Sequence, residues 1–130
     1  MVFGVFDVVH AGHKAFFAQA KKYGNYLIVA LTQDHIVEHL KLRLPKKSFV
    51  ERFDHLKKED FVDEIVIGDA ELGTYEVVKK YKPDVIALGY DQKVLKKDLE
   101  SHKKEFQWPL QILVMESFEP KKYHSSILKK

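Results

Sequence analysis

Short apolar runs alternate along the chain with segments whose apolar residues recur at helical spacing. The apolar runs predict strands at residues 2–6, 26–32, 65–67, 84–88 and 110–115. The segments between them predict helices at residues 11–23, 34–40, 48–58, 74–81 and 94–106. A capping box at Ser48 and Glu51 marks the start of the third of these helices.

The alternation of strands and helices predicts the fold class. Strands separated by helices form parallel pairs with right-handed crossovers, and almost wholly apolar strands are covered on both faces. We therefore predict an α/β fold, a single doubly wound, Rossmann-like five-stranded parallel sheet with helices on both faces. No linker, repeat or low-complexity segment interrupts the pattern, so residues 1–130 are expected to form one domain. In such sheets ligands bind beyond the carboxyl ends of the strands, where the strand order reverses.

Composition narrows the possible function classes. The chain has no cysteine, which excludes a disulfide framework, a thiolate zinc site and a cysteine nucleophile. Its 22 lysines and arginines against 19 acidic residues give a net charge of +3, too small an excess to favour nucleic acid as a partner. No segment reaches the roughly 18 apolar residues of a membrane span. The N-terminus also lacks the basic start of a signal peptide, so we expect a cytoplasmic protein with no membrane partner.

Two histidines lie at the predicted start of the first helix, just after the first strand. His10 and His13 are three residues apart and share one helix face, and the helix N-terminus adds unpaired N–H donors. Gly12 removes a side chain where a phosphate must come close. This pattern favours a phosphate site over two alternatives. In the first alternative, the histidines only pack against the core and cap the helix. In the second, they bind zinc, and Asp7 is the only nearby residue in the sequence that could serve as the third ligand.

The ten residues Gly4–His13 match every fixed position of a known signature, G-x-F-D-x-x-H-x-G-H. Through it the chain resembles the cytidylyltransferase-like nucleotidyltransferases. The resemblance implies transfer of a nucleoside monophosphate from ATP or CTP to a phosphorylated small-molecule acceptor, with release of pyrophosphate. It implies catalytic roles for His10, His13 and Asp7, and nucleotide contacts from Val5, Phe6 and Gly12. It also implies Mg²⁺ carried by the triphosphate rather than by protein side chains, and a homodimer.

A basic segment, Lys41–Lys47, precedes Glu51 and Arg52. It resembles the family's stretch of basic residues and proline followed by Glu-Arg, which implies that Arg52 contacts the triphosphate. The same resemblance places the acceptor phosphate on three basic side chains, Lys41, Arg43 and Lys46. Leu42 departs from the glycine that is common there in relatives, and we expect its large side chain to stiffen or block the segment.

Residues Lys82–Gln92 are very similar to the fourth-strand segment of archaeal FAD synthetase-like proteins. In that family the loop after this strand lies beside the first-strand loop. The similarity implies that Gly89 and Tyr90 lie next to the nucleoside and that Asp91 binds its ribose or base.

Ser125 and Ser126 match the family's hydroxyls that hold the β- and γ-phosphates at the N-terminus of its last helix. The arginine of the longer family version is missing before them. Lys121 or Lys122 is the nearest replacement for its charge, although a lysine cannot copy the bidentate contact of an arginine.

These resemblances predict an FAD synthetase-like enzyme that moves AMP from ATP to FMN. One alternative is a CTP-dependent cytidylyltransferase that acts on glycerol 3-phosphate or a similar phospho-alcohol. Another, from a different class, is a catalytically weak nucleotide-binding module, motivated by Leu42 and the missing arginine. The sequence leaves the base and the acceptor open.

Overall fold

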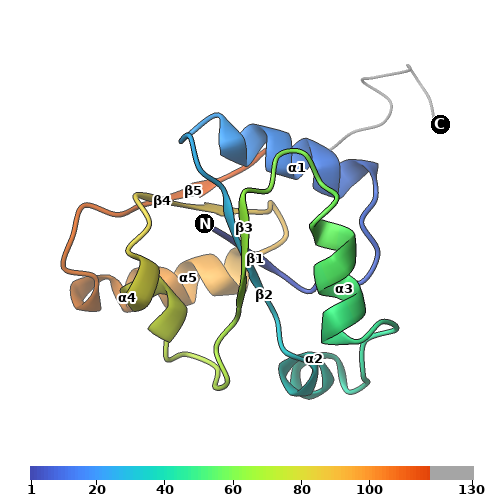
Figure 1. Ribbon diagram of the computed structural model, residues 1–130. Helices are drawn as coiled ribbons and strands as arrows, with labels where there is room; N and C mark the ends of the chain where they lie inside the picture. The colour runs from blue at the N-terminus through green and yellow to red at the C-terminus, as the bar shows by residue number, and fades with distance from the viewer. Residues whose placement is uncertain (118–130) are drawn as a thin grey trace.

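The structure is a computed structural model, and it describes residues 1–117. Its strands are β1 (Val2–Gly4), β2 (Ile28–Leu31), β3 (Glu64–Ile67), β4 (Val85–Leu88) and β5 (Gln111–Val114). Its helices are α1 (Ala11–Lys21), α2 (Asp34–Lys41), α3 (Phe49–Leu56), α4 (Glu76–Tyr81), α5 (Lys93–Ser101) and the short 3-10 helix η1 (Lys103–Glu105). This order confirms the predicted alternation of strands and helices (Figure 1), although the helix expected at residues 94–106 is divided into α5 and η1.

All the strand pairs within the sheets are parallel, as predicted. β2 lies between β1 and β3, and β4 pairs with β5. β1 and β4 are neighbours, because the N–H of Ala87 donates to the Met1 carbonyl at 3.0 Å and the Met1 amino group donates to the Val85 carbonyl at 2.8 Å. These bonds do not join β1 and β4 into one sheet, and the described strands form sheets of three and two. The single five-stranded sheet is therefore not confirmed.

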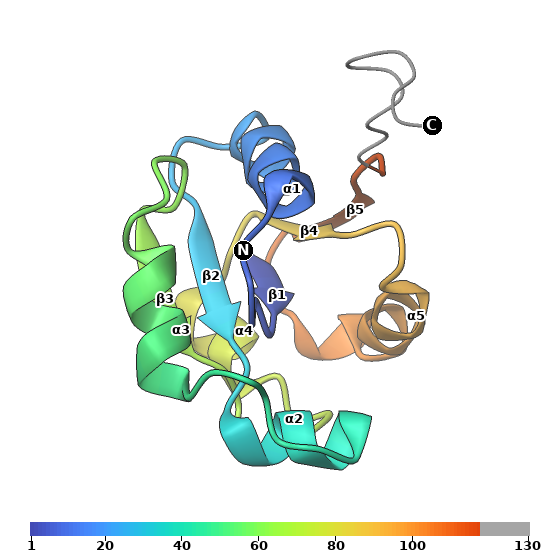
Figure 2. The ribbon, with the colours of Figure 1, turned by 90° about the vertical axis from the view of Figure 1, so that its right-hand side faces the viewer.

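Helices cover the strands on two sides, as the near-continuous apolar strands predicted. In Figures 1 and 2, α1 and α3 lie on one side of β1–β3, and α4 and α5 lie on the other. Successive strand residues point into opposite layers, since Ile86 and Leu88 belong to one buried cluster and Ala87 to the other. Each buried Leu, Ile or Phe contributes about 1.5–3 kcal/mol of transfer free energy.

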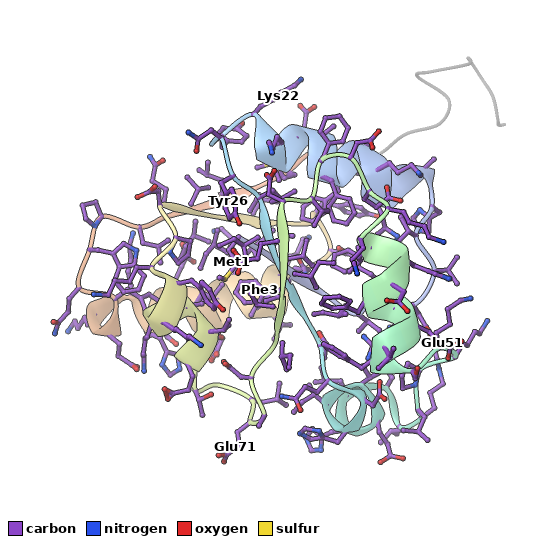
Figure 3. All side chains as sticks on the ribbon, in the orientation of Figure 1. Met1, Phe3, Lys22, Tyr26, Glu51 and Glu71 are labelled. Atoms are coloured by element: carbon purple, nitrogen blue, oxygen red, sulfur yellow. The ribbon has the colours of Figure 1, made fainter. Side chains whose placement is uncertain are left out.

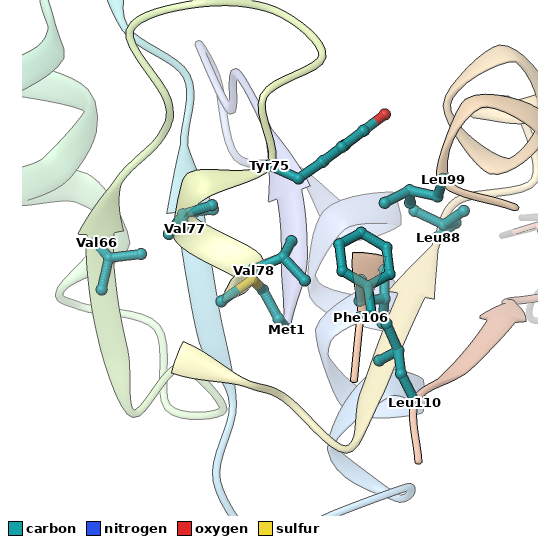
Figure 4. Close-up of a cluster of buried hydrophobic side chains, with 11 residues drawn as sticks. Met1, Val66, Tyr75, Val77, Val78, Leu88, Leu99, Phe106 and Leu110 are labelled. Atoms are coloured by element: carbon teal, nitrogen blue, oxygen red, sulfur yellow. The ribbon is translucent and has the colours of Figure 1, made fainter. Parts of the chain in front are cut away.

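The first cluster, between the strands and α4 and α5, is drawn in Figure 4. Side chains from α4, α5 and the strands point toward one another in it, including Val66, Val78, Leu88, Leu99 and Phe106. The second cluster joins the strands to α1 and α3 through fully buried Phe17 and Leu56. None of the helices within residues 1–117 is long and apolar enough to cross a membrane.

The predicted capping box at the start of α3 is confirmed. The Ser48 hydroxyl accepts a hydrogen bond from the Glu51 N–H at 3.3 Å, and the Glu51 carboxylate accepts one from the Ser48 N–H at 3.0 Å. These bonds satisfy two N–H groups that the helix itself leaves without partners.

Candidate active site

A cavity of about 1300 Å³ opens at the carboxyl ends of the strands. The loops after β1, β2, β3 and β4 line it, together with Glu116 after β5. Among the predicted site residues of the described chain, the cavity is lined by Val5, Phe6, Asp7, His10, Gly12, His13, Lys41, Arg43, Lys46, Gly89, Tyr90 and Asp91. The structure thus brings together the two histidines, the basic segment and the fourth-strand loop.

The two histidines cap α1 with their own rings. His10 is the N-cap residue, and its Nδ1 atom accepts a hydrogen bond from the Gly12 N–H at 3.0 Å. The Nδ1 atom of His13 accepts one from the His10 N–H at 3.3 Å. The rings stack with their centroids 3.9 Å apart and an interplanar angle of 22°. Capping, one alternative from the sequence, is therefore present, but it uses only the Nδ1 side of each ring.

The capping bonds determine where the imidazole protons lie. A ring nitrogen that accepts a hydrogen bond carries no proton, so each neutral ring has its proton on Nε2. Burial, followed by the neighbouring His10, lowers the pKa of His13, which keeps that ring neutral at neutral pH. The buried Phe6 ring meets His13 edge-on, with 5.1 Å between centroids. The pair is held rigidly as a source of Nε2–H donors, a geometry suited to phosphate oxygens.

Asp7 joins the first-strand loop to the basic segment. Its carboxylate accepts hydrogen bonds from the backbone N–H of Lys46 at 2.7 Å and of Lys47 at 2.8 Å. Burial opposes its charge, but these donors and the nearby guanidinium groups of Arg52 and Arg43 outweigh that effect and lower the pKa of Asp7. Because both oxygens accept backbone N–H groups, Asp7 holds the first-strand loop against the basic segment.

Arg52 does not reach the cavity, contrary to the sequence prediction. Its side chain is fully buried, with 0% exposure. The guanidinium donates to the Val5 carbonyl at 2.9 Å, to the Lys47 carbonyl at 3.2 Å and to the Asp34 carboxylate at 2.6 Å. All of these partners lie on separate segments around the site. Arg52 therefore holds the first-strand loop, α2 and the basic segment together, and is not placed to contact a triphosphate.

The basic segment borders the cavity with exposed side chains. Lys41, Arg43 and Lys46 line it, so their positive charge faces the same space as the histidine pair. Leu42 does not block this space, contrary to our expectation, because it is 90% exposed and does not line the cavity. Its backbone is left-handed, with φ of 58°, at the C-cap of α2. This conformation explains why glycine suits the position, since a left-handed residue with a side chain costs about 1 kcal/mol.

The loop after β4 lies opposite the histidines. Gly89, Tyr90 and Asp91 line the cavity, and Asp91 is close enough to His13 for its charge to act on the ring. Gly89 has little free space, because a Cβ atom there would lie 2.9 Å from the Asp91 carboxylate. A side chain at position 89 would push Asp91 away from its place.

Sequence reasoning missed several residues that hold the site in shape. Gln92 ends the segment recognised as FAD synthetase-like but was given no role, and its side chain bonds both Gly89 and the β1 carbonyl of Phe3. Asp34 was read only as the start of a helix, yet it pairs with buried Arg52. Both follow the ends of strands, which is the one signal in the sequence that marks them.

The described residues supply no obvious metal site. Within residues 1–117, no group of three or more His, Asp or Glu side chains is placed to hold a metal ion. The zinc alternative for His10 and His13 therefore lacks a third ligand in this part of the chain. Ser125 and Ser126 lie outside the described residues, as do Lys121 and Lys122.

Comparison with known proteins agrees with this geometry. A family model described as cytidylyltransferase-like matches residues 1–130. The FAD synthase of Thermococcus sibiricus is 47% identical over 89 residues, which cover 68% of this chain and 60% of the relative. The FAD synthase of Pyrococcus horikoshii is 44% identical over 92 residues, covering 71% of this chain and 62% of the relative. The chain thus matches only about three fifths of these two relatives.

A solved structure shares the fold over most of the chain. The crystal structure of the lipopolysaccharide core biosynthesis protein from Thermoplasma volcanium aligns with a TM-score of 0.82 and 28% identity. The alignment covers 92% of this chain and 96% of that one. With a family model that spans all 130 residues and relatives above 40% identity, the chain belongs to the cytidylyltransferase-like family.

Proposed function

We propose that the protein is a nucleotidyltransferase that moves AMP from ATP to FMN and releases pyrophosphate. The observation that carries the proposal is the His10–His13 pair at the N-terminus of α1, facing a cavity that the basic segment and the Gly89 loop also line. The FAD synthase relatives favour ATP and FMN as the substrates.

The reaction needs charge stabilisation more than covalent chemistry. An oxygen of the acceptor phosphate attacks the α-phosphorus, a new P–O bond forms, and the bond from the α-phosphorus to the bridging oxygen breaks. Pyrophosphate leaves with that electron pair, so no enzyme intermediate and no added proton are required. The Nε2–H groups of His10 and His13 and the helix N-terminus donate to the oxygens on which negative charge grows.

The acceptor phosphate is proposed to bind the basic segment, where Lys41, Arg43 and Lys46 border the cavity. The two hydrogen bonds from the backbone of Lys46 and Lys47 to the Asp7 carboxylate, here called the latch, keep those charges beside the histidines. An acceptor held there approaches the α-phosphate in a fixed orientation, which removes much of the entropic cost of the bimolecular step.

The cavity also suits a planar apolar ring such as that of FMN. Ligand pockets for single drug-sized molecules measure roughly 300–1000 Å³, and this one is larger, at about 1300 Å³. Leu40 and Leu72 line it although they are 58% and 52% exposed, so their apolar surfaces are open to a ligand. A cavity of this size has room for a nucleotide and a second substrate side by side.

Mg²⁺ belongs to the proposal as part of the substrate. In this proposal Mg²⁺ arrives with the triphosphate and neutralises part of its charge. Asp7, the carboxylate nearest to His10 and His13 in the sequence, accepts backbone N–H groups from the basic segment. A homodimer and a cytoplasmic location are further parts of the proposal. The homodimer rests on the family resemblance, and the location rests on the sequence pattern and composition.

Pyrophosphate release tests the proposal. The protein is incubated with ATP or CTP and Mg²⁺, and with FMN, glycerol 3-phosphate or phosphocholine as the acceptor. We expect release with ATP and FMN. Release with CTP and a phospho-alcohol would replace this assignment by the cytidylyltransferase. If no combination releases pyrophosphate while calorimetry still shows binding of the triphosphate, the protein is a nucleotide-binding module.

A further inference from the structure

The pairing between β1 and β4 begins as a regular parallel ladder. The Met1 amino group donates to the Val85 carbonyl, and the Ala87 N–H donates to the Met1 carbonyl. In such a ladder the bonds repeat every two residues along each strand. The next bond from β4 is therefore expected to run from the Gly89 N–H to the Phe3 carbonyl.

A side chain takes the place of that bond. The Gly89 N–H donates to the Oε1 atom of Gln92 at 2.8 Å, and the Nε2 atom of Gln92 donates to the Phe3 carbonyl at 3.1 Å. The carboxamide thus sits between the two partners and satisfies both of them. β1 and β4 are the end strands of the two sheets, so the insertion occurs where the two sheets meet. Phe3 is labelled in Figure 3.

The local chain is shaped to make this insertion possible. Gln92 is the N-cap residue of α5 but makes no side-chain cap, so its amide is used elsewhere. Its N–H donates to the Gly89 carbonyl at 3.0 Å, which folds the loop back on itself. A Cβ atom at position 89 would lie 2.9 Å from the Asp91 carboxylate but only in ordinary van der Waals contact with Gln92, 3.6 Å from its Oε1 atom. The glycine therefore makes room for Asp91, and the turn of the loop brings the Gln92 amide to the backbone.

The insertion lies where the strands divide into sheets of three and two. The carboxamide takes the place of a bond that would continue the pairing of β1 with β4. In doubly wound folds, ligands bind in the crevice at the point where the strand order reverses. Phe3, Gly89 and Gln92 all line the cavity.

We propose that Gln92 is a positioning residue that holds β1 and β4 apart and so keeps the crevice open for the nucleotide. This inference rests on the proposed function for the identity of the ligand. Gln92 acts through the Gly89 backbone. The donation of His10 and His13 to the phosphate oxygens does not require Gln92. Loss of the amide allows Gly89 to bond Phe3 directly, which narrows the crevice.

The test compares Gln92→Ala and Gln92→Glu with the wild type and with Gln111→Ala, an exposed glutamine on β5. The carboxylate of Gln92→Glu accepts from Gly89 but cannot donate to Phe3. Binding is measured by calorimetry with the α,β-methylene analogue of ATP and Mg²⁺. We expect affinity about tenfold lower in both Gln92 variants, a difference of about 1.4 kcal/mol, and no loss in the control. In turnover the KM for ATP should rise by a similar factor while kcat changes little.

An NMR measurement detects the backbone hydrogen bond between Gly89 and Phe3 directly. In Gln92→Ala, the scalar coupling across a hydrogen bond from the Gly89 nitrogen to the Phe3 carbonyl carbon should appear, whereas the wild type should lack it. Nucleotide affinity equal to that of the control, or no new coupling, overturns the inference. Because neither readout needs an acceptor, a wild type that binds the analogue but never transfers AMP refutes only the proposed function. A wild type that does not bind the analogue refutes both.

Discussion

The guanidinium of Arg52, fully buried, forms a 2.6 Å ion pair with the half-buried carboxylate of Asp34. The pair lies behind the site, between α2 and α3, and the same guanidinium bonds the carbonyls of Val5 and Lys47. An arginine without exposure is costly unless each donor finds a partner, and here the partners come from three loops around the cavity. The geometry of the first-strand loop therefore depends on a residue that does not line the cavity.

Arg52→Met removes the guanidinium and should lower the free energy of unfolding by about 2–4 kcal/mol, because the variant leaves the Asp34 carboxylate and two partly buried carbonyls without their donor. Urea unfolding followed by circular dichroism measures the change. Arg43→Met is the matched control, since Arg43 is exposed and, within residues 1–117, its side chain bonds the neighbouring Leu44 carbonyl. A loss below about 1 kcal/mol, the range of an exposed pair, would show that Arg52 does not hold the loops together.

His13→Ala should reduce kcat by about two orders of magnitude or more, as expected when a donor to the transition state is removed. The fold should survive, because His13 is only partly buried and the Nδ1 bond to His10 is one of several at the helix start. Steady-state assays of the pyrophosphate product give the rate. His55→Ala, an exposed histidine at the end of α3, serves as the control. A near-normal kcat in His13→Ala would remove the histidine mechanism.

The rate should also depend on pH through His13. Its pKa lies below the ordinary 6.5, since burial and His10 disfavour the charged ring. The neutral form is therefore retained as pH falls to 6.5, and kcat/KM should decline only below that value, when Nδ1 is protonated and loses its bond from His10. The same protonation costs folding free energy, so stability should also fall in that acidic range. An NMR titration of the His13 ring with a midpoint at or above 6.5 would contradict this assignment.

Asp7→Asn should weaken acceptor binding more than nucleotide binding. The asparagine amide keeps one acceptor oxygen but turns an NH₂ group toward the second backbone N–H, so one half of the latch to Lys46 and Lys47 is lost. We expect the KM for FMN to rise about tenfold, equivalent to about 1.4 kcal/mol, with a smaller change for ATP. Asp54→Asn, exposed on α3, is the control. An unchanged KM for FMN would mean that the latch does not place the basic segment.

The sequence was sufficient for the strand and helix order and for the place of the site. Buried parallel strands are apolar throughout, and residues that follow them meet at one edge of the layer. This is why the loops after Phe6 and Leu88 were expected to converge, and they do. The Gly4–His13 signature identified the family before any geometry was known, because it combines a strand end, a glycine and two histidines in one short segment.

Hydrogen bonds between side chains and distant parts of the chain could not be predicted from the sequence. Arg52 was predicted at the triphosphate from the resemblance to the family's Glu-Arg pair. That resemblance does not show the bonds to Val5 and Asp34, which hold the arginine in a fully buried position. Where the two sheets meet, Gln92 reaches across to Phe3, 89 residues earlier in the chain. Leu42 was expected to stiffen or block the segment. Its side chain is 90% exposed and its backbone is left-handed, a conformation that the local sequence pattern does not reveal.

One measurement tests the proposed function most directly. The wild-type protein is incubated with FMN, Mg²⁺ and ATP that carries radioactive phosphorus in its α-phosphate, and the flavin products are separated. We predict that the label appears in FAD in equal amount to the pyrophosphate released, and that His13→Ala forms about a hundredth as much or less. Label that stays in ATP, with no labelled flavin while the protein binds both substrates, would contradict the assignment of the His10–His13 site to AMP transfer.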